Sequence, residues 1–334
     1  MDILKGALCL EGGSLRGLFT AGVLDAFLDN DLYIEYVNGV SAGSMNGMNY
    51  ISRQKGRSKR INLKYLHDKR YISYKNMLTK RQIFNFDFLF DEISNKLDLF
   101  DKKSFFDSNK KFEVVATDVK TGESEFFEKN SCSDIISAVK ASASMPVMSK
   151  MVEVDGRKYL DGGISTSIAY KRAFDLGYEK AIVILTREDG YRKKPVNKLD
   201  EAIYKMYFKP LPNLLEKLMT VPERYNLMQE EMDELQKAGK LLIIRPQKKV
   251  VVHRLERSAD KLENLYNEGY REGLKNIENM VIETEREGGK VLVIKMSNNT
   301  EDRSIFTAGY VYDLRMIRKI ILEYKVKGEE EWNF

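Results

Sequence analysis

Apolar and polar positions along the first fifty residues predict strands and helices in alternation. Residues 3–10, ILKGALCL, form a short apolar run that predicts a buried strand, and this run leads directly into the glycine-rich stretch EGGSLRG. Apolar side chains then recur with a helical period, and a second short strand, IEYVNGV, is followed by Ser41 and a helix from about Ala42 to Tyr50. Such alternation indicates a parallel sheet with helices on its faces.

The rest of the chain continues this pattern after an irregular segment. Residues 53–111 are rich in Lys and Arg and contain the aromatic block RQIFNFDFLFDEI, so we expect an insertion of helices and loops. The stretches KFEVVATDV and GESEFF predict one hairpin, and MVEVDGRKYLDGG predicts a second hairpin that turns at Asp155 and Gly156. Further predicted elements are helices at about 133–143, 167–176, 197–239 and 258–286, and strands at AIVILT and LLIIRP.

A linker divides the chain near its C-terminus. Glu287-Gly288-Gly289 is the best linker candidate in the sequence, which predicts a main domain over 1–287 and a small unit over 288–334. The small unit contains a predicted strand, KVLVIKM, and a predicted helix, VYDLRMIRKIILEYK. The sequence assigns this α/β extension no role.

Composition and charge narrow the class of protein. The 334 residues are 43% hydrophobic and 31% charged, which is typical of a globular chain. The net charge of +5 is mild: it gives no reason to expect a nucleic-acid partner, and it leaves open a peripheral contact with an anionic membrane surface. Cys9 and Cys132 are expected to be free thiols rather than a disulfide or metal pair. No apolar run approaches the roughly 18 residues of a membrane span, and Glu11 interrupts the first one, so we expect a cytoplasmic protein.

The stretch NGVSAGS contains a Gly-x-Ser-x-Gly pattern, from Gly39 through Ser41 to Gly43. A serine nucleophile needs a sharp turn between a strand and a helix, where glycines permit a strained backbone and close neighbours. The pattern here lies at such a junction, although a glycine-lined turn with an incidental serine remains an alternative. Ser41 is therefore a candidate nucleophile.

The glycine-rich stretch after the first strand is a candidate oxyanion hole. Backbone amides near Gly12, Gly13 and Ser14, at the start of a helix, could hold the negative charge that forms on a carbonyl oxygen. A loop that cradles phosphate is the alternative, but the glycine spacing does not fit Gly-x-Gly-x-x-Gly, and the sequence has no Gly-Lys-Ser/Thr.

A nucleophilic serine also needs a base, and the chain has only two histidines, His67 and His253. His253 follows a late strand and could meet the usual chain order of a Ser-His-Asp hydrolase, whereas His67 could not. A carboxylate can act as the base when it lies within hydrogen-bond reach of the serine. Asp161, in YLDGG at the exit of a hairpin, is the best candidate, with an ordinary turn aspartate as the alternative.

Together these motifs resemble the patatin-like phospholipase family. The family's glycine-rich block matches EGGSLRG (residues 11–17), its Gly-x-Ser-x-Gly matches residues 39–43, and its Asp-Gly-Gly matches residues 161–163. Ser14 stands where a third glycine is common. Two softer family features, VVATDVKTGE and ASASMP, lie between the serine and the aspartate, and the resemblance covers roughly residues 5–285.

The resemblance implies a three-layer α/β/α sandwich around a mostly parallel sheet, and a serine acyl hydrolase with a catalytic dyad. Ser41 would attack the ester carbonyl of a lipid, Asp161 would be the base, and the amides of Gly12, Gly13 and Ser14 would hold the oxyanion, with Arg16 orienting that loop. The family's chemistry implies no metal and no cofactor.

Several questions stay open at the level of sequence. The ester bond cleaved, its position and the oligomeric state are not indicated. Residues 71–106 have the composition of an interfacial lid and equally that of an amphipathic segment packed on the core. A catalytically silent lipid- or partner-binding protein that keeps the patatin-like fold is the alternative function.

Overall fold

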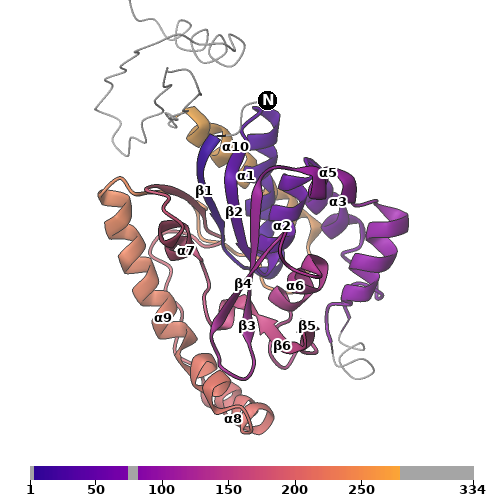
Figure 1. Ribbon diagram of the computed structural model, residues 1–334, viewed down its shortest axis with the longest axis vertical. Coiled ribbons are helices and arrows are strands. Elements are labelled where there is room, and N and C mark those ends of the chain that lie inside the picture. Colours follow the sequence, from indigo (N-terminus) through magenta and orange to yellow (C-terminus); the bar gives the residue numbers. More distant parts are fainter. Residues whose placement is uncertain (1–3, 74–81, 279–334) are drawn as a thin grey trace, which may run out of the picture.

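A computed structural model describes residues 4–73 and 82–278, which fold into a central sheet between two layers of helices (Figure 1). Successive side chains of a strand point to opposite faces of a sheet. In strand β1 (Leu4–Leu10), Leu8 and Leu10 pack on one helical layer, and Ala7 and Cys9 pack on the other. Both faces of the sheet are therefore buried, and the predicted α/β fold is confirmed.

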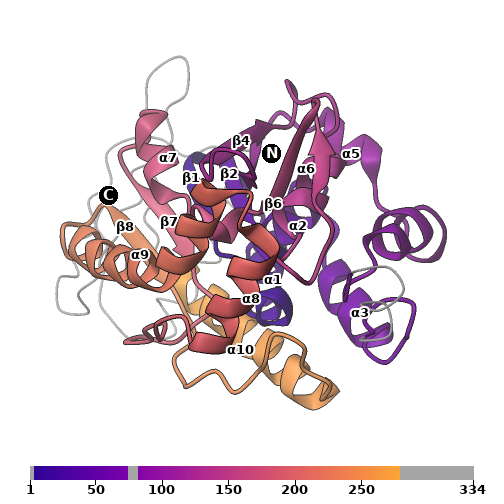
Figure 2. The ribbon, with the colours of Figure 1, turned by 90° about the horizontal axis from the view of Figure 1, so that it is seen from below.

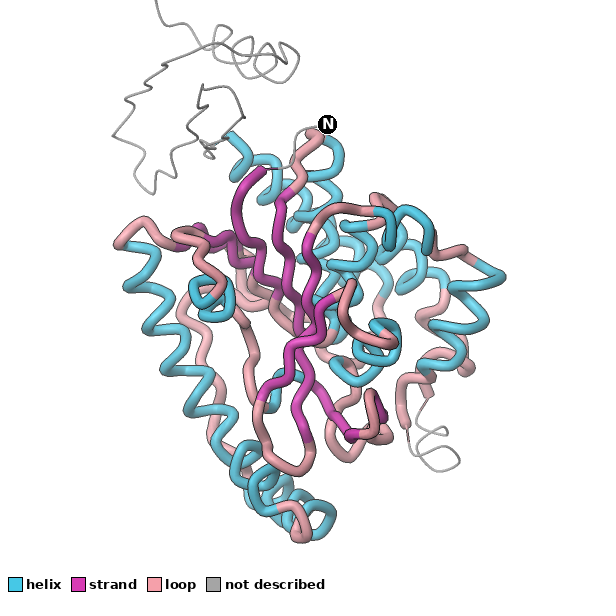
Figure 3. Tube along the Cα trace, in the orientation of Figure 1, coloured by secondary structure: helices cyan, strands magenta, loops and turns pink. Residues whose placement is uncertain are grey.

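The sheet is parallel through its centre and antiparallel at one end. Within the described residues the sheet has eight strands: seven follow the order β5-β6-β3-β2-β1-β7-β8, and β4 pairs with β3 beside this path (Figure 3). The pairs from β3 to β8 along this order are parallel, whereas β4 and β6 run antiparallel to β3. The other strands are β2 (Ile34–Val40), β3 (Lys111–Asp118), β4 (Ser124–Glu128), β5 (Val152–Val154), β6 (Arg157–Asp161), β7 (Ala181–Ile184) and β8 (Leu241–Ile244).

Different helices cover the two faces of the sheet. Helices α1, α2, α6 and α10 pack on one face of the sheet, and α7 and α9 pack on the other (Figure 2). No helix in the described part of the chain is both long and apolar enough to cross a membrane. The α-helices are α1 (Leu18–Asp29), α2 (Ala42–Ile51), α3 (Arg57–Lys64), α5 (Lys102–Asp107), α6 (Ile135–Ser142), α7 (Tyr170–Asp175), α8 (Lys198–Phe208), α9 (Pro212–Lys237) and α10 (Ala259–Glu278); η1 (Ser14–Gly17) and η3 (Gly162–Ile164) are 3-10 turns, and η2 (Phe88–Leu97) is a π-helix.

Strand β3 changes its partner halfway along one edge. Its first half pairs with β2, and the last pair in that register joins Val40 to Val115. From the next residue, Ala116, β3 pairs with β6, and Ala116 faces Asp161. Because β2 is parallel to β3 and β6 is antiparallel to it, the carboxyl ends of β2 and β6 meet at this point.

Helices α1 and α10 approach each other closely although they are about 240 residues apart in sequence. Glycines on both helices allow this contact. A Cβ atom built on Gly22 of α1 would lie 2.1 Å from the carbonyl oxygen of Tyr266, and one on Gly269 of α10 would lie 2.0 Å from that of Phe19. The hydroxyl of Tyr266 also donates a 2.7 Å hydrogen bond to Asp25 of α1. Residues 259–278 are thus part of the main fold.

The irregular segment between α2 and β3 packs its aromatic side chains inward. Phe84, Phe86 and Phe88 are buried in the main core, together with Ile93 of η2. Arg57 of α3 ties the segment together by donating to the Ser94 hydroxyl and the Asp98 carbonyl. Part of 71–106 therefore packs in the core, although Leu97, Leu99 and Phe106 are exposed, and residues 74–81 lie outside the described residues.

Most predicted elements are found near their expected positions, including the hairpin that turns at Asp155 and Gly156. The predicted helical stretch 197–239 is two helices, because α8 ends at Phe208 and a new helix begins at Pro212, which suits a first helical turn. The predicted linker at 287–289 and the unit over 288–334 lie outside the described residues.

The close contact of α1 and α10 gives a test of the fold. Gly269→Ala should lower the free energy of unfolding by about 1–3 kcal/mol, because its methyl group would overlap the Phe19 carbonyl. Chemical denaturation measures the change. Gly6→Ala is the matched control, since nothing lies within 4 Å of its Cβ. Equal stability of the two variants would contradict the helix packing.

Candidate active site

Ser41 lies at the sharp turn between β2 and α2. Its backbone has φ 54° and ψ −122°, a strained conformation for a residue other than glycine. The flanking glycines are needed for space, since a Cβ on Gly39 would lie 2.6 Å from the Ser44 backbone and one on Gly43 would lie 2.4 Å from the Leu10 carbonyl oxygen. The Ser41 amide donates a 2.7 Å hydrogen bond to the hydroxyl of Ser142, so α6 holds the turn in place.

Asp161 lies at the end of β6, where the carboxyl ends of β2 and β6 meet. Its amide donates to the Ser144 carbonyl at 2.8 Å, and its own carbonyl accepts from the Thr117 hydroxyl at 2.8 Å. The carboxylate accepts a 2.8 Å hydrogen bond from the Gly163 amide, and the Ser41 side chain lies close enough to lower its pKa. The structure therefore places the side chains of Ser41 and Asp161 close to each other.

Burial makes the Asp161 carboxylate more basic than an exposed one. Its side chain is 8% exposed, and this loss of solvation raises its pKa above the ordinary value. The Ser41 side chain, the hydrogen bond from Gly163, and the positive charges of Arg254 and Lys193 act in the opposite direction but do not outweigh burial.

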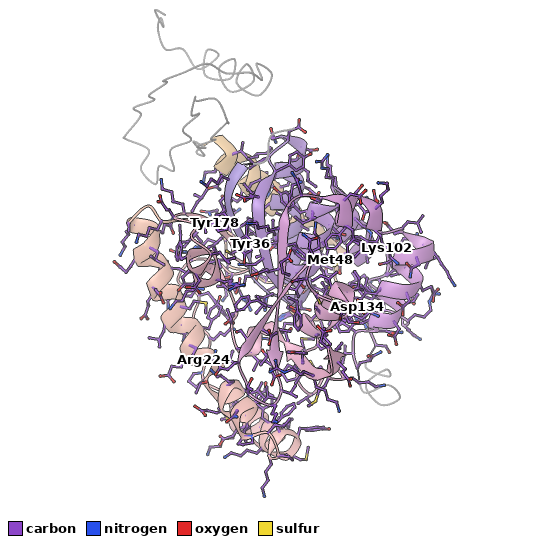
Figure 4. The ribbon with its side chains drawn as sticks, viewed as in Figure 1. Tyr36, Met48, Lys102, Asp134, Tyr178 and Arg224 are labelled. Carbon is purple, nitrogen blue, oxygen red and sulfur yellow. The ribbon has the colours of Figure 1, made fainter. Side chains whose placement is uncertain are left out.

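The turn that follows Asp161 is fixed from outside the sheet. Arg224, which Figure 4 labels on α9, donates hydrogen bonds to the carbonyls of Ile164 and Ser165 just after Asp161. A Cβ on Gly162 would lie 2.2 Å from the Val115 carbonyl oxygen, so this position must be glycine for β3 to approach. The backbone around Asp161 is therefore tied to both β3 and α9.

The glycine-rich loop after β1 lies against Ser41. A Cβ on Gly12 would be 3.0 Å from the Cβ of Ser41, and one on Gly13 would be 2.6 Å from the hydroxyl of Thr186. Ser14 has a left-handed backbone (φ 52°), and its hydroxyl donates a 2.8 Å hydrogen bond to the Arg254 carbonyl. Ser14, which stands where the motif commonly has a third glycine, thus adopts this conformation and makes a hydrogen bond that glycine could not make.

Glu11 anchors this loop to the neighbouring strand and to α9. Its buried carboxylate accepts hydrogen bonds from the amide and the hydroxyl of Thr186, which follows β7, and a 3.0 Å bond from the Tyr225 hydroxyl. Arg16 is 9% exposed, and its Nε has no hydrogen-bond partner among the described residues. Burial, with Arg187 and Arg254 nearby, lowers the pKa of Arg16 to about 10.

A cavity of about 300 Å³ has Ser41 and Ser14 in its wall. It extends between α2, the inserted segment and α6, and about half of its lining side chains are aliphatic or aromatic while the others are mostly polar or charged. Figure 4 labels Met48 of α2, Lys102 of α5 and Asp134, the N-cap of α6, which all line it. This volume is at the lower end of the range for ligand pockets. Its aromatic lining includes Tyr71, Phe84, Phe86, Phe90 and Phe100.

The two histidines and the two cysteines lie apart from this arrangement of groups. His67 and His253 are exposed, and the described residues contain no cluster of three or more His, Cys, Asp or Glu that could hold a metal ion. Cys9 lies in β1 with a buried side chain, and burial raises the pKa of its thiol to about 12, whereas Cys132 is a free, half-buried thiol.

Sequence reasoning missed the groups that hold the two candidate residues in place. Ser142 and Ser144 bind the backbones of Ser41 and Asp161, and both lie in ASASMP, whose run of small residues before a proline was the available signal. Thr186 and Tyr225 gave no signal, because a hydroxyl that serves a distant carboxylate has no local pattern.

The chain was compared with known protein families, curated proteins and solved structures. Residues 8–173 match the family "Patatin-like phospholipase", and residues 211–284 match a domain of unknown function (DUF6363). The chain is 29% identical to the uncharacterized protein YjjU of Escherichia coli (strain K12) over 222 residues, which cover 63% of this chain and 60% of YjjU.

A crystal structure of VipD from Legionella pneumophila matches with a TM-score of 0.46 and 12% identity, over 82% of this chain and 66% of that one. The chain thus spans less than two thirds of the length of either relative. The matched segment 8–173 holds Ser41, Asp161 and the glycine-rich loop. Residues 8–173 are therefore similar to the patatin-like phospholipase family, and the match includes every residue of the candidate dyad and loop.

Proposed function

We propose that this protein is a serine acyl hydrolase that cleaves carboxylic esters of lipids. The observation that carries the proposal is the closeness of the Ser41 side chain to the buried Asp161 carboxylate, with Ser41 in the wall of a cavity. A hydroxyl is a weak nucleophile until a base accepts its proton, and a carboxylate within hydrogen-bond reach can do this. The match of residues 8–173 to the family supports lipid ester hydrolysis in general.

The proposed reaction has two halves. The Ser41 oxygen attacks the ester carbonyl carbon while Asp161 accepts its proton, and the ester C–O bond then breaks as Asp161 returns this proton to the leaving alcohol. A water molecule attacks the resulting acyl-serine, gives a proton to Asp161 and releases the fatty acid, and Ser41 recovers its proton. The steps use no metal and no cofactor.

The glycine-rich loop is proposed to hold the oxyanion of both tetrahedral intermediates. Amides near Gly12, Gly13 and Ser14 could supply its hydrogen bonds, and the contact of Gly12 with Ser41 supports this assignment. Arg16 is proposed to orient the loop. Gly39 and Gly43 give Ser41 the space that its turn requires.

We propose that the cavity takes the acyl part of a substrate, because five aromatic side chains line it and Ser41 lies in its wall. Phospholipase A or lysophospholipase activity follows as the finer proposal. We assign the hydrolase domain to residues 1–287, since β7, β8 and α10 complete the sheet and the layer that surround the site.

Ser41→Ala tests the nucleophile. We expect it to lower kcat for p-nitrophenyl acyl esters by at least about a thousandfold, because no other group takes over the attack. Circular dichroism should show an unchanged fold. His67→Ala and His253→Ala are controls that should keep their activity. A Ser41→Ala protein that retains a tenth of the wild-type rate would exclude this assignment, and a wild-type protein without activity would favour the silent, lipid-binding alternative.

Asp161→Asn tests the buried carboxylate through stability as well as activity. Because burial raises the folded-state pKa, the carboxylate form costs stability at neutral pH, and this cost disappears as the pH falls through the raised pKa toward the ordinary value near 4. Asp161→Asn should therefore lose turnover but raise Tm by a few degrees at pH 8, and this gain should shrink as the pH is lowered. A Tm below that of the wild type at pH 8 would contradict the burial argument.

A further inference from the structure

Four cationic side chains surround the glycine-rich loop without a carboxylate partner. Arg16 belongs to the loop, Arg187 and Lys193 follow β7, and Arg254 lies between β8 and α10. Within residues 4–73 and 82–278, none of the four forms an ion pair within 4.0 Å. Two buried arginines elsewhere do, since Arg57 pairs with Asp98 and Arg245 pairs with Asp189 and Asp233. Of the four cations, Arg16 is buried and Arg254 is exposed.

Hydrogen bonds place Lys193 and Arg254 next to the proposed catalytic groups. The Lys193 ammonium donates a 3.4 Å hydrogen bond to the Ser167 hydroxyl, which in turn donates to the carbonyl of Gly163, two residues after Asp161. The Arg254 carbonyl accepts from Ser14, so its residue lies directly on the glycine-rich loop. Both also lie close enough to Asp161 to lower its pKa.

The carboxylates nearest in sequence to these cations are already engaged elsewhere. Glu11 accepts from Thr186 and Tyr225, and Glu188 accepts from the Val250 amide. Glu256 accepts from the amides of residues 253, 257 and 258. None of these carboxylates forms an ion pair with the four cations, although the charge of Glu11 raises the pKa of Arg16 and of Lys193. The excess of positive charge is therefore only partly offset within the described residues.

An excess of positive charge destabilises the folded protein unless a bound anion offsets it. Like charges held together in a partly buried place repel one another, and removing a cation from water has its own cost. Burial is the main cause that lowers the pKa of Lys193 to about 8; Arg254 and Arg16 lower it further, while Glu11 and Asp161 raise it. Arg16 is 9% exposed, and its Nε has no hydrogen-bond partner among the described residues.

We propose that Lys193 and Arg254, supported by Arg16, bind an anionic group, phosphate or carboxylate, that the ester substrate carries on its alcohol side. The inference rests on the proposed hydrolase function and names the class of its substrate. None of the four cations lines the cavity, whereas Ser41 does. The acyl chain and the anionic group thus have separate sites, with the ester at Ser41 between them.

Two of these cations lie outside the patatin-like match, and this gives the second matched segment a role. Arg254 belongs to residues 211–284, the domain of unknown function, and Lys193 lies in the connection that precedes it. This segment also supplies Tyr225, which binds Glu11 below the loop. In our proposal residues 174–284 supply the contacts that select the charged end of the substrate.

The test compares two esters that share one acyl chain, an acyl glycerol phosphate and the neutral acyl glycerol. Lys193→Gln and Arg254→Gln should each lower the ratio of kcat/KM, anionic over neutral, by about tenfold or more, mainly through KM for the anionic ester. The ratio cancels any common effect on Asp161. Lys194→Gln, an exposed neighbour, is the control and should keep the wild-type ratio. An unchanged ratio in both variants would overturn the proposal.

A binding measurement separates this proposal from the hydrolase function. Decyl phosphate, decanol and inorganic phosphate are titrated into the Ser41→Ala protein by calorimetry, with and without Lys193→Gln or Lys194→Gln. We expect decyl phosphate to bind most tightly, and to lose about tenfold in affinity with Lys193→Gln only. If inorganic phosphate binds as tightly as decyl phosphate, the site takes free phosphate and the assignment to a substrate is wrong. Equal binding of decanol and decyl phosphate, or equal losses in both lysine variants, would exclude an anion site even if esters are hydrolysed.

Discussion

The arrangement of the site depends on the change of partner along strand β3. It pairs with β2 as far as Val115 and with β6 from Ala116 onward, so a parallel and an antiparallel strand end against each other on one edge. The residue that follows β2 is Ser41 and the last residue of β6 is Asp161, and backbone pairing alone brings their side chains together. The Ser142 hydroxyl accepts from the Ser41 amide, and the Thr117 hydroxyl donates to the Asp161 carbonyl. These two hydrogen bonds hold the ends of β2 and β6 in place.

The arrangement of the site lowers the stability of the fold, as is expected of a functional site. Ser41 holds a strained backbone, Asp161 is a carboxylate that burial makes harder to ionise, and several cations nearby have no carboxylate partner among the described residues. Each of these lowers stability, and the rest of the fold offsets them through a sheet buried on both faces and close helix contacts. In the proposed reaction the same features give Asp161 its basicity and leave positive charge free for a substrate.

Local features of the fold could be predicted from sequence, and non-local ones could not. The strand before Ser41, the hairpin at Gly156 and the glycines around Ser41 follow from short-range patterns, and so the two candidate residues were identified from the sequence. The partner change of β3 and the contact of Gly269 with α1 join segments that are far apart, and no local pattern specifies them. The same holds for the positioning hydroxyls and for the unpaired cations, which become visible only when the carboxylates around them are seen to be engaged.

The central claim is that the contact between Ser41 and Asp161 makes this serine reactive. Labelling with a fluorophosphonate probe, followed by mass spectrometry of the peptides, tests it most directly, since the probe attaches covalently to an activated serine and requires no knowledge of the natural ester. The account predicts a single labelled residue, Ser41, with a labelling rate that falls by at least about a hundredfold in Asp161→Asn. Labelling of a different residue, or of Ser41 at the same rate in both proteins, would contradict it.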